Sequence, residues 1–275
     1  MNVCCELQVG HLYAIEQGQG RPVLFVHGWC MSSAIWRQQQ QAVAEEHRYL
    51  ALDLRGHGRS AIPRDGRSGF DAYAGDIVSL VEALDLRDLT LVGWSLGAQA
   101  CLKAVPLLAE RVSGLVLVGA TPRFTASVDF PHGLPRNEAE GMRLKVRRNL
   151  ERALEGFQHR MFAEGELADP SRQAAVARIL ADVALPDPAV ALDGLESLMD
   201  EEVMGEAVLV DCPVLLQHGE QDRICLPDAS RWLEQHCPRA RRIEYPGCGH
   251  APFLSRPEQF NRDLLAFAGE APSNV

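Results

Sequence analysis

The sequence lacks the two features that would attach the chain to a membrane or send it out of the cell. No apolar run approaches the roughly 18 residues that span a bilayer. The first nine residues, MNVCCELQV, contain neither a basic stretch nor an apolar core, so they do not resemble a signal peptide. We therefore expect a cytoplasmic protein with no membrane partner.

Basic residues are also scarce. Lys and Arg number 27 against 37 Asp and Glu, which gives a formal net charge of −10. Because nucleic-acid-binding proteins usually carry a basic surface, this balance argues against a nucleic-acid partner. The acidic background makes any local cluster of cations more informative.

Patterns for metal, nucleotide and disulfide sites are missing as well. The eight cysteines are scattered and form no C-x-x-C pair, which is typical of reduced thiols in a cytoplasm. No metal-ligand spacing such as H-E-x-x-H is present, and neither is a P-loop or a dinucleotide-binding G-x-G-x-x-G. We expect neither a metal nor another cofactor.

What is present is the order of apolar runs typical of an α/β fold. Of the 275 residues, 47% are hydrophobic and 23% are charged, which suits one globular α/β domain with an insertion. Alternating strand and helix patterns favour a mainly parallel, doubly wound sheet with helices on both faces. The patterns predict a hairpin over 5–16, strands at 22–26, 48–53, 89–92, 114–118, 213–218 and 242–245, and helices at 33–46 and 71–85.

The alternation stops after Pro122. Residues 123–205, called the lid segment below, contain no convincing strand pattern. They show helical patterns instead, near 138–163, 171–183 and 188–200. We expect this segment to form a helical lid inserted between two strands of a core made of residues 1–122 and 206–275.

A serine lies where a predicted strand meets a predicted helix. The residues Gly93-Trp94-Ser95-Leu96-Gly97 fit the pattern G-x-S-x-G. A serine at such a sharp turn has a strained backbone, which small neighbours permit, and its hydroxyl is exposed to a base. We interpret Ser95 as the candidate nucleophile.

A serine hydroxyl is a poor nucleophile at neutral pH, so a base must accept its proton and a carboxylate must orient that base. In doubly wound hydrolases these residues follow in the order Ser, Asp or Glu, His, at the carboxyl ends of strands. Asp222 and His250 each lie in a loop that follows one of the last two predicted strands. We predict them as acid and base, in preference to Glu220 and Asp228, and we interpret His218 as a structural residue.

The loop after the first buried strand predicts a site for an oxyanion. It reads His27-Gly28-Trp29, and the backbone N–H of Trp29 would face the N–H of Leu96. Two fixed donors of this kind would lower the barrier by several kcal/mol, by analogy with about 3 kcal/mol for one donor. The Trp29 indole would line the pocket, and His27 would hold the loop by hydrogen bonds.

Together these segments resemble the α/β-hydrolase superfamily over nearly the whole chain. Within it, the chain is similar to the pimeloyl-[acyl-carrier protein] methyl ester esterases of biotin synthesis, through residues 26–29, 93–97, 194–198 and 250–253. The resemblance implies a serine carboxylesterase that hydrolyses the methyl ester of a pimeloyl chain on acyl-carrier protein. It also implies that one stretch of the lid segment binds the acyl chain, namely Phe157, Gln158, His159, Arg160 and Met161.

The lid segment adds a charge pattern. Residues 141–152 contain five basic residues and one acidic residue. Placed on one helix, the apolar residues of 146–161 would form one stripe, and Lys145, Arg148 and Arg152 would lie on the opposite face. Such a patch on an acidic chain suits an acidic partner, and acyl-carrier protein is strongly acidic. We predict these three cations as partner-binding residues of a monomeric enzyme.

Two other functions stay open. The first is a different enzyme of the same fold, such as a general short-chain esterase, a lactonase or a ring-cleavage C–C hydrolase. The second is a non-enzymatic ligand-binding protein of the same fold, against which the complete set of Ser, Asp and His argues. A dehalogenase or an epoxide hydrolase is disfavoured, because those families have Asp where this chain has Ser95.

Overall fold

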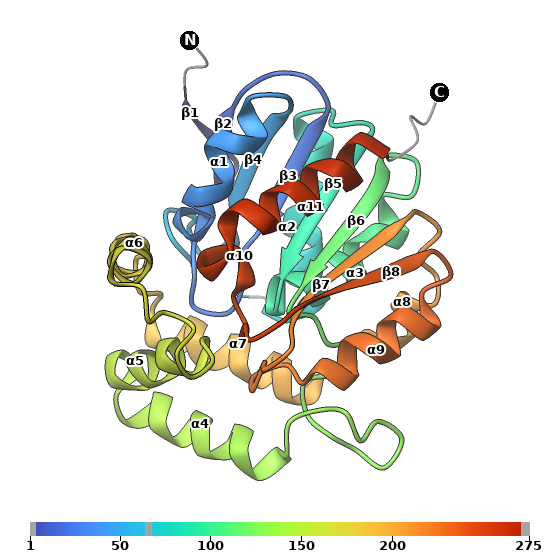
Figure 1. The fold of residues 1–275 in the computed structure, drawn as a ribbon. Coiled ribbons are helices and arrows are strands. Elements are labelled where there is room, and N and C mark those ends of the chain that lie inside the picture. Colours follow the sequence, from blue (N-terminus) through green and yellow to red (C-terminus); the bar gives the residue numbers. More distant parts are fainter. Residues whose placement is uncertain (1–3, 64–65, 67, 271–275) are drawn as a thin grey trace.

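One eight-stranded sheet organises the chain (Figure 1). The computed structural model describes residues 4–63, 66 and 68–270. In the order of the sheet, the strands are β1 (Cys5–Val9), β2 (Leu12–Gln17), β4 (Arg48–Asp53), β3 (Pro22–Val26), β5 (Leu89–Trp94), β6 (Val112–Val118), β7 (Val214–Gly219) and β8 (Ala240–Tyr245). β2 pairs antiparallel with β1 and β4, and the other neighbours pair parallel. The predicted α/β fold and the predicted hairpin are confirmed.

Helices cover both faces of the sheet. In Figure 1, α1 (Arg37–Ala44) and α11 (Pro257–Glu270) lie in front of it, and α2 (Phe70–Ala83) and α3 (Leu96–Ala104) lie behind it. α9 (Pro227–His236) packs against β7 and β8. The helix predicted at 33–46 begins as a short 3-10 helix, so only its second part is α-helical. Shorter helices are η1 (Ser33–Trp36), η2 (Val105–Leu107), α8 (Met204–Ala207) and α10 (Pro252–Ser255).

The central strands of the sheet lie in the core, and aromatic rings pack near the turn that carries Ser95. β3, β5, β6 and β7 are buried along their whole length, as expected for parallel strands covered on both faces. Beneath the carboxyl end of β5, the Phe253 ring lies 4.4 Å from Trp36 and 5.0 Å from Trp94 between centroids. This aromatic cluster supports the residues on either side of Ser95 and His250.

The lid segment contains four longer helices. They are α4 (Arg136–Arg148), α5 (Leu150–Arg160), α6 (Pro170–Asp182) and α7 (Pro188–Asp200), and they lie together below the sheet in Figure 1. Contacts with the loop after β3 bring them to the carboxyl ends of the strands. The domain boundaries given above stay a prediction.

The prediction of one continuous helical face over 146–161 is wrong. Asn149 has extended backbone angles (φ −164°, ψ 103°) and separates α4 from α5. Its side-chain oxygen accepts a hydrogen bond from Arg152 N at 2.9 Å, so it caps α5, as asparagine often does. Lys145 and Arg148 therefore lie on α4, whereas Arg152 lies on α5.

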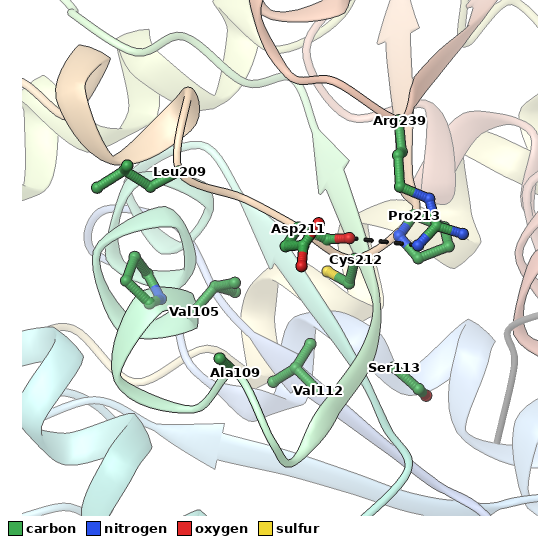
Figure 2. A pocket seen from close by; sticks show the side chains of 10 residues that line it. Val105, Ala109, Val112, Ser113, Leu209, Asp211, Cys212, Pro213 and Arg239 are labelled. Atoms are coloured by element: carbon green, nitrogen blue, oxygen red, sulfur yellow. Dashed lines mark hydrogen bonds between the residues drawn. The ribbon is translucent and has the colours of Figure 1, made fainter. Parts of the chain in front are cut away.

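A cavity of about 190 Å³ lies at the end of the sheet where β6 and β7 begin (Figure 2). Val112 and Pro213, at or beside the first residues of β6 and β7, line it, and Arg239 donates to the backbone oxygen of Asp211 at 3.3 Å. Ser95 follows the last residue of β5, so it lies at the other end of the strands. The cavity is therefore separate from the candidate site.

Candidate active site

Ser95 occupies the sharp turn between β5 and α3. Its backbone angles, φ 57° and ψ −118°, are ones that residues with a side chain rarely adopt. The neighbouring chain leaves no room for larger residues: a Cβ on Gly93 would lie 2.5 Å from Gly97 O, and one on Gly97 would lie 2.4 Å from His27 O. The structure thus has the strained serine turn that the sequence predicts.

His250 and Asp222 form a buried pair. His250 Nδ1 lies 2.7 Å from Asp222 Oδ2, and both side chains are inaccessible to solvent. With the carboxylate as acceptor, Nδ1 carries the proton, which leaves Nε2 as the acceptor of the ring. Nε2 is buried and has no hydrogen-bond partner among the described residues. An imidazole in this state can accept a proton from a nearby hydroxyl.

Asp222 is stabilised as a carboxylate. Its Oδ1 accepts backbone hydrogen bonds from Ile224 at 2.8 Å and Cys225 at 3.0 Å. Burial alone would raise the pKa of Asp222, but electrostatic attraction to His250 and hydrogen bonds from His218 and His250 lower the pKa well below its ordinary value. Asp222 is therefore ionised at neutral pH.

His218 contacts this carboxylate, a role that the sequence did not reveal. Its Nε2 lies 2.8 Å from Cys225 O and 3.3 Å from Asp222 Oδ2. Because both partners are acceptors, Nε2 is the donor. In the sequence, the only sign of this contact was the position of His218 near the end of β7, four residues before Asp222.

Neighbours of Ser95 in the chain and in the sheet connect its turn to the loop of His250. Trp94 donates its indole N–H to His250 O at 2.9 Å. Ser95 N donates to Val118 O at 3.0 Å, and the following residue, Gly119, packs against the imidazole. A Cβ on Gly119 would lie 2.9 Å from His250 Nδ1. The structure thus brings Ser95, Asp222 and His250 together at one edge of the sheet.

Two backbone N–H groups lie near Ser95, those of Trp29 and Leu96. A Cβ on Gly28 would lie 3.3 Å from Ser95 Cβ, so the loop after β3 passes close to the serine. The N–H groups of Trp29 and Leu96 have no hydrogen-bond acceptor among the residues that the structure describes. Unpaired backbone donors beside a serine hydroxyl are suited to an oxyanion.

The histidine of this loop is neutral and structural. His27 Nδ1 lies 2.8 Å from Gly28 O, and its Nε2 accepts a hydrogen bond from Leu54 N at 3.1 Å. Burial lowers the pKa of His27 to about 4. His27 therefore holds the loop, as the sequence predicts.

The Trp29 indole connects the loop to the lid segment. Trp29 Nε1 donates to Ala191 O of α7 at 2.8 Å, and the indole meets the Phe157 ring of α5 at a centroid distance of 5.3 Å, nearly edge to face. A Cβ on Gly194 would lie 3.1 Å from the indole, so a glycine there lets α7 approach. The indole therefore also fastens the lid segment to the loop.

The five residues of the expected acyl-binding stretch face in different directions. Phe157 and Met161 are buried, Gln158 is half-buried, and His159 and Arg160 are exposed. Arg160 donates to Arg223 O at 3.1 Å, in the loop of Asp222. Of these five, only the two apolar side chains are buried; the Phe157 ring contacts Trp29, and the Met161 backbone contacts that of His250.

The three cations expected to bind a partner are available to one. Lys145, Arg148 and Arg152 are exposed and have no ion-pair partner in the described part of the chain. Their neighbours Arg143 and Arg147, in contrast, both lie within 3.7 Å of Glu196. The free positive charge of α4 and α5 therefore lies at the predicted positions.

Two searches of the described residues found nothing. In the ranges 4–63, 66 and 68–270, no group of His, Cys, Asp and Glu side chains could hold a metal ion. None of the helices in those ranges combines the length and the apolar character needed to cross a membrane.

Known proteins resemble this chain in sequence and in structure. Residues 21–257 match the α/β-hydrolase fold family. The chain is 34% identical to pimeloyl-[acyl-carrier protein] methyl ester esterase from Nitrosomonas europaea, over 88% of this chain and 94% of that protein. It is 30% identical to a non-heme haloperoxidase from Rhodococcus erythropolis, over 92% and 93%. An esterase from Exiguobacterium antarcticum has a similar structure, with a TM-score of 0.86 and 25% identity over 94% and 96% of the two chains.

Proposed function

We propose that the chain, which belongs to the α/β-hydrolase fold family, is a serine carboxylesterase. Its proposed substrate is the methyl ester of a pimeloyl chain carried by acyl-carrier protein, in biotin biosynthesis. One arrangement carries the proposal. Ser95 lies on a strained turn at the same end of the sheet as an imidazole whose Nδ1 is fixed by buried Asp222 and whose Nε2 has no partner among the described residues. This arrangement supports acyl transfer through a serine ester.

In the proposed reaction, Ser95 Oγ attacks the ester carbonyl while His250 Nε2 accepts its proton. The N–H groups of Trp29 and Leu96 bind the negative oxygen of the tetrahedral intermediate. His250 then gives the proton to the methanol oxygen as that C–O bond breaks, which leaves an acyl-enzyme. Water, deprotonated by His250, attacks this ester and releases the free acid and Ser95. Asp222 keeps the proton on Nδ1 and stabilises the imidazolium.

The lid segment supports the substrate part of the proposal. Buried Phe157 and Met161 offer an apolar contact for the acyl chain. The residues between them in the chain are half-buried or exposed, namely Gln158, His159 and Arg160. The unpaired cations of α4 and α5 suit an acidic carrier protein. The relative from Nitrosomonas europaea, whose name states this substrate, points the same way. A cytoplasmic location and a monomeric state stay predictions.

The decisive experiment pairs a purified reaction with growth. Wild-type protein should release methanol from pimeloyl-[acyl-carrier protein] methyl ester and restore growth without biotin in a strain that lacks the methyl esterase. Ser95→Ala should lower kcat by roughly 10⁶-fold, as in other serine hydrolases, and should not restore growth. Equal thermal midpoints of the two proteins would exclude misfolding. Turnover retained by Ser95→Ala would contradict the mechanism.

A different enzyme of the same fold is the alternative to this proposal. A relative of similar identity is named a haloperoxidase, so this family includes proteins named for other activities. A general short-chain esterase, lactonase or C–C hydrolase would hydrolyse its own small substrates but would not restore growth without biotin. A non-enzymatic ligand-binding protein would show neither activity, and Ser95 would not be labelled by a fluorophosphonate.

A further inference from the structure

A single buried carboxyl group joins the lid segment to the loop of His250. Glu166 follows α5 and is 6% exposed. Its Oε2 accepts backbone hydrogen bonds from Ala163 N at 2.6 Å and from Gly249 N at 2.8 Å, although Gly249 lies 83 residues further along the chain. A buried carboxyl group is costly unless it is hydrogen-bonded. Oε2 makes two bonds to backbone at the junction of two segments, whereas Oε1 is buried and has no hydrogen-bond partner among the described residues.

The same turn contacts His250 itself. Met161 O accepts a hydrogen bond from His250 N at 2.7 Å. A Cβ on Gly249 would lie 2.4 Å from Met161 O and 3.0 Å from Ala163 N, so the two backbones pack with no space for a side chain. Residues 160–166, called the lid turn below, therefore lie directly against the loop of the candidate base.

His250 is thus held from two sides. From the sheet, the Trp94 indole binds His250 O at 2.9 Å. From the lid turn, Met161 O and Glu166 Oε2 bind the N–H groups of His250 and Gly249. Asp222 orients the imidazole ring but does not bind the backbone of His250. The contacts from the lid turn and from Trp94 therefore fix the backbone that carries the ring next to Asp222.

We propose that Glu166 is a positioning residue for the catalytic histidine, because its two hydrogen bonds lock the lid turn against the loop that carries His250. The inference rests on the proposed function, since it takes His250 as the base. A displacement of about 1 Å of a reacting group can lower a rate about 100-fold. Loss of the two bonds should therefore lower kcat and leave the KM of a small ester nearly unchanged.

Two conservative substitutions separate the effect of side-chain length at position 166 from the effect of its negative charge. Glu166→Gln keeps the length of the side chain and an oxygen acceptor for both N–H groups. Glu166→Asp keeps the carboxyl group but is one methylene shorter, so it cannot reach both. Glu164→Ala is the matched control, because Glu164 lies in the same turn and is exposed.

The assay uses p-nitrophenyl acetate, with active sites counted by fluorophosphonate titration. In Glu166→Asp, kcat per active site should fall about 10- to 100-fold. Glu166→Gln should stay within about threefold of wild type, because amide and carboxyl oxygens accept the same bonds. Glu164→Ala should match wild type. The reverse order, with Gln inactive and Asp active, would overturn the proposal in favour of a role of the charge.

Proton NMR gives a readout that does not depend on turnover. The low-field signal of the His250 Nδ1–H bonded to Asp222 should persist in Glu166→Gln and shift or broaden in Glu166→Asp. A purely structural role would lower the thermal midpoint of Glu166→Asp without changing this signal, and that result would also overturn the proposal. If wild-type protein hydrolyses no ester, the proposed function fails, but the NMR comparison still decides whether Glu166 positions the ring.

Discussion

The sheet edge formed by the carboxyl ends of the strands and the lid segment differ in how far their candidate functional residues are buried. At the edge, Ser95, Asp222 and His250 are at most 5% exposed, and each follows a strand of the central sheet. In the lid segment, α4 and α5 leave charged faces in water, and a few contacts around Trp29 and Glu166 join them to the sheet. Under the proposed function, the chemistry would depend on buried geometry, and recognition of the carrier would depend on exposed charge. Substitutions in the two regions should therefore differ in size.

The largest effect in this comparison is expected at the buried acid. Asp222→Asn keeps the size of the side chain, but its amide no longer holds the proton on His250 Nδ1, so the imidazole adopts the wrong tautomer. We expect kcat to fall about 10⁴-fold with an unchanged fold, as for the same change in other triads. Steady-state kinetics on p-nitrophenyl esters and circular dichroism measure both quantities. A loss below about tenfold would mean that Asp222 does not orient the base.

A pair of glycine substitutions compares the two regions directly. Gly119→Ala places a Cβ 2.9 Å from His250 Nδ1, at a residue whose φ is 50°, and should lower kcat about 10- to 100-fold by displacing the ring. Gly156→Ala lies on an exposed face of α5 with no atom within 4 Å. It should leave kcat unchanged and raise the free energy of unfolding by about 0.5 to 1 kcal/mol, because alanine favours a helix. Equal effects on kcat at both positions would remove the distinction between edge and lid.

The sheet edge could be predicted from the sequence because its signals are local. Strands at 22–26 and 48–53 have the predicted bounds, since apolar runs flanked by turn residues identify buried strands. The loops that carry Ser95, Asp222 and His250 follow directly from such strands. Chain order and strand ends were sufficient to choose these residues among many carboxylates and histidines.

The lid segment was harder to predict because its signals are weaker or distant. Helical periodicity over 138–163 did not reveal the break at Asn149, because an asparagine is tolerated within a helix as well as at its start. Glu166 and Gly249 meet across 83 residues, and no local pattern marks such a contact. The contact of His218 with Asp222 likewise depends on how the loop after β7 folds back.

A smaller effect is expected for the exposed cations. Lys145→Glu, Arg148→Glu and Arg152→Glu together should lower kcat/KM for the carrier-bound ester about tenfold at low salt, by weakening electrostatic attraction to an acidic carrier. The same variant should hydrolyse p-nitrophenyl acetate like wild type. The difference should shrink as ionic strength rises, because salt screens exposed charges.

A control variant with the same change in net charge makes this result specific. It reverses three exposed arginines outside α4 and α5, namely Arg178, Arg239 and Arg262. This control should keep its kcat/KM for the carrier-bound ester within about twofold, since steering depends on the location of the charges. Equal losses in the two variants would mean that net charge, and not the cations of α4 and α5, attracts the carrier.

The last prediction concerns the free energy of unfolding and not a rate, and it involves two buried histidines, His27 and His57. Their rings lie 5.1 Å apart, and burial lowers their pKa values from 6.5 to about 4 and about 3; for His57, the nearby His27 contributes as well. Above about pH 6.5 both are neutral in the folded and the unfolded chain. Below it, the unfolded chain binds protons that the folded chain does not, so the free energy of unfolding should fall as pH falls.

Urea unfolding between pH 7.5 and 4.5 tests this expectation, with a slope of at most about 1.4 kcal/mol per pH unit for each histidine. Burial also lowers the pKa of His47, which adds a smaller loss in the same direction. Asp222 acts only below this range, since its folded pKa is lowered from 3.8. His57→Gln should make the slope shallower, whereas His236→Gln, at an exposed position, should leave it unchanged. A stability that stays constant down to pH 4.5 would show that the two rings accept protons without unfolding, so the loop next to Ser95 would be less tightly packed than the rest of the sheet edge.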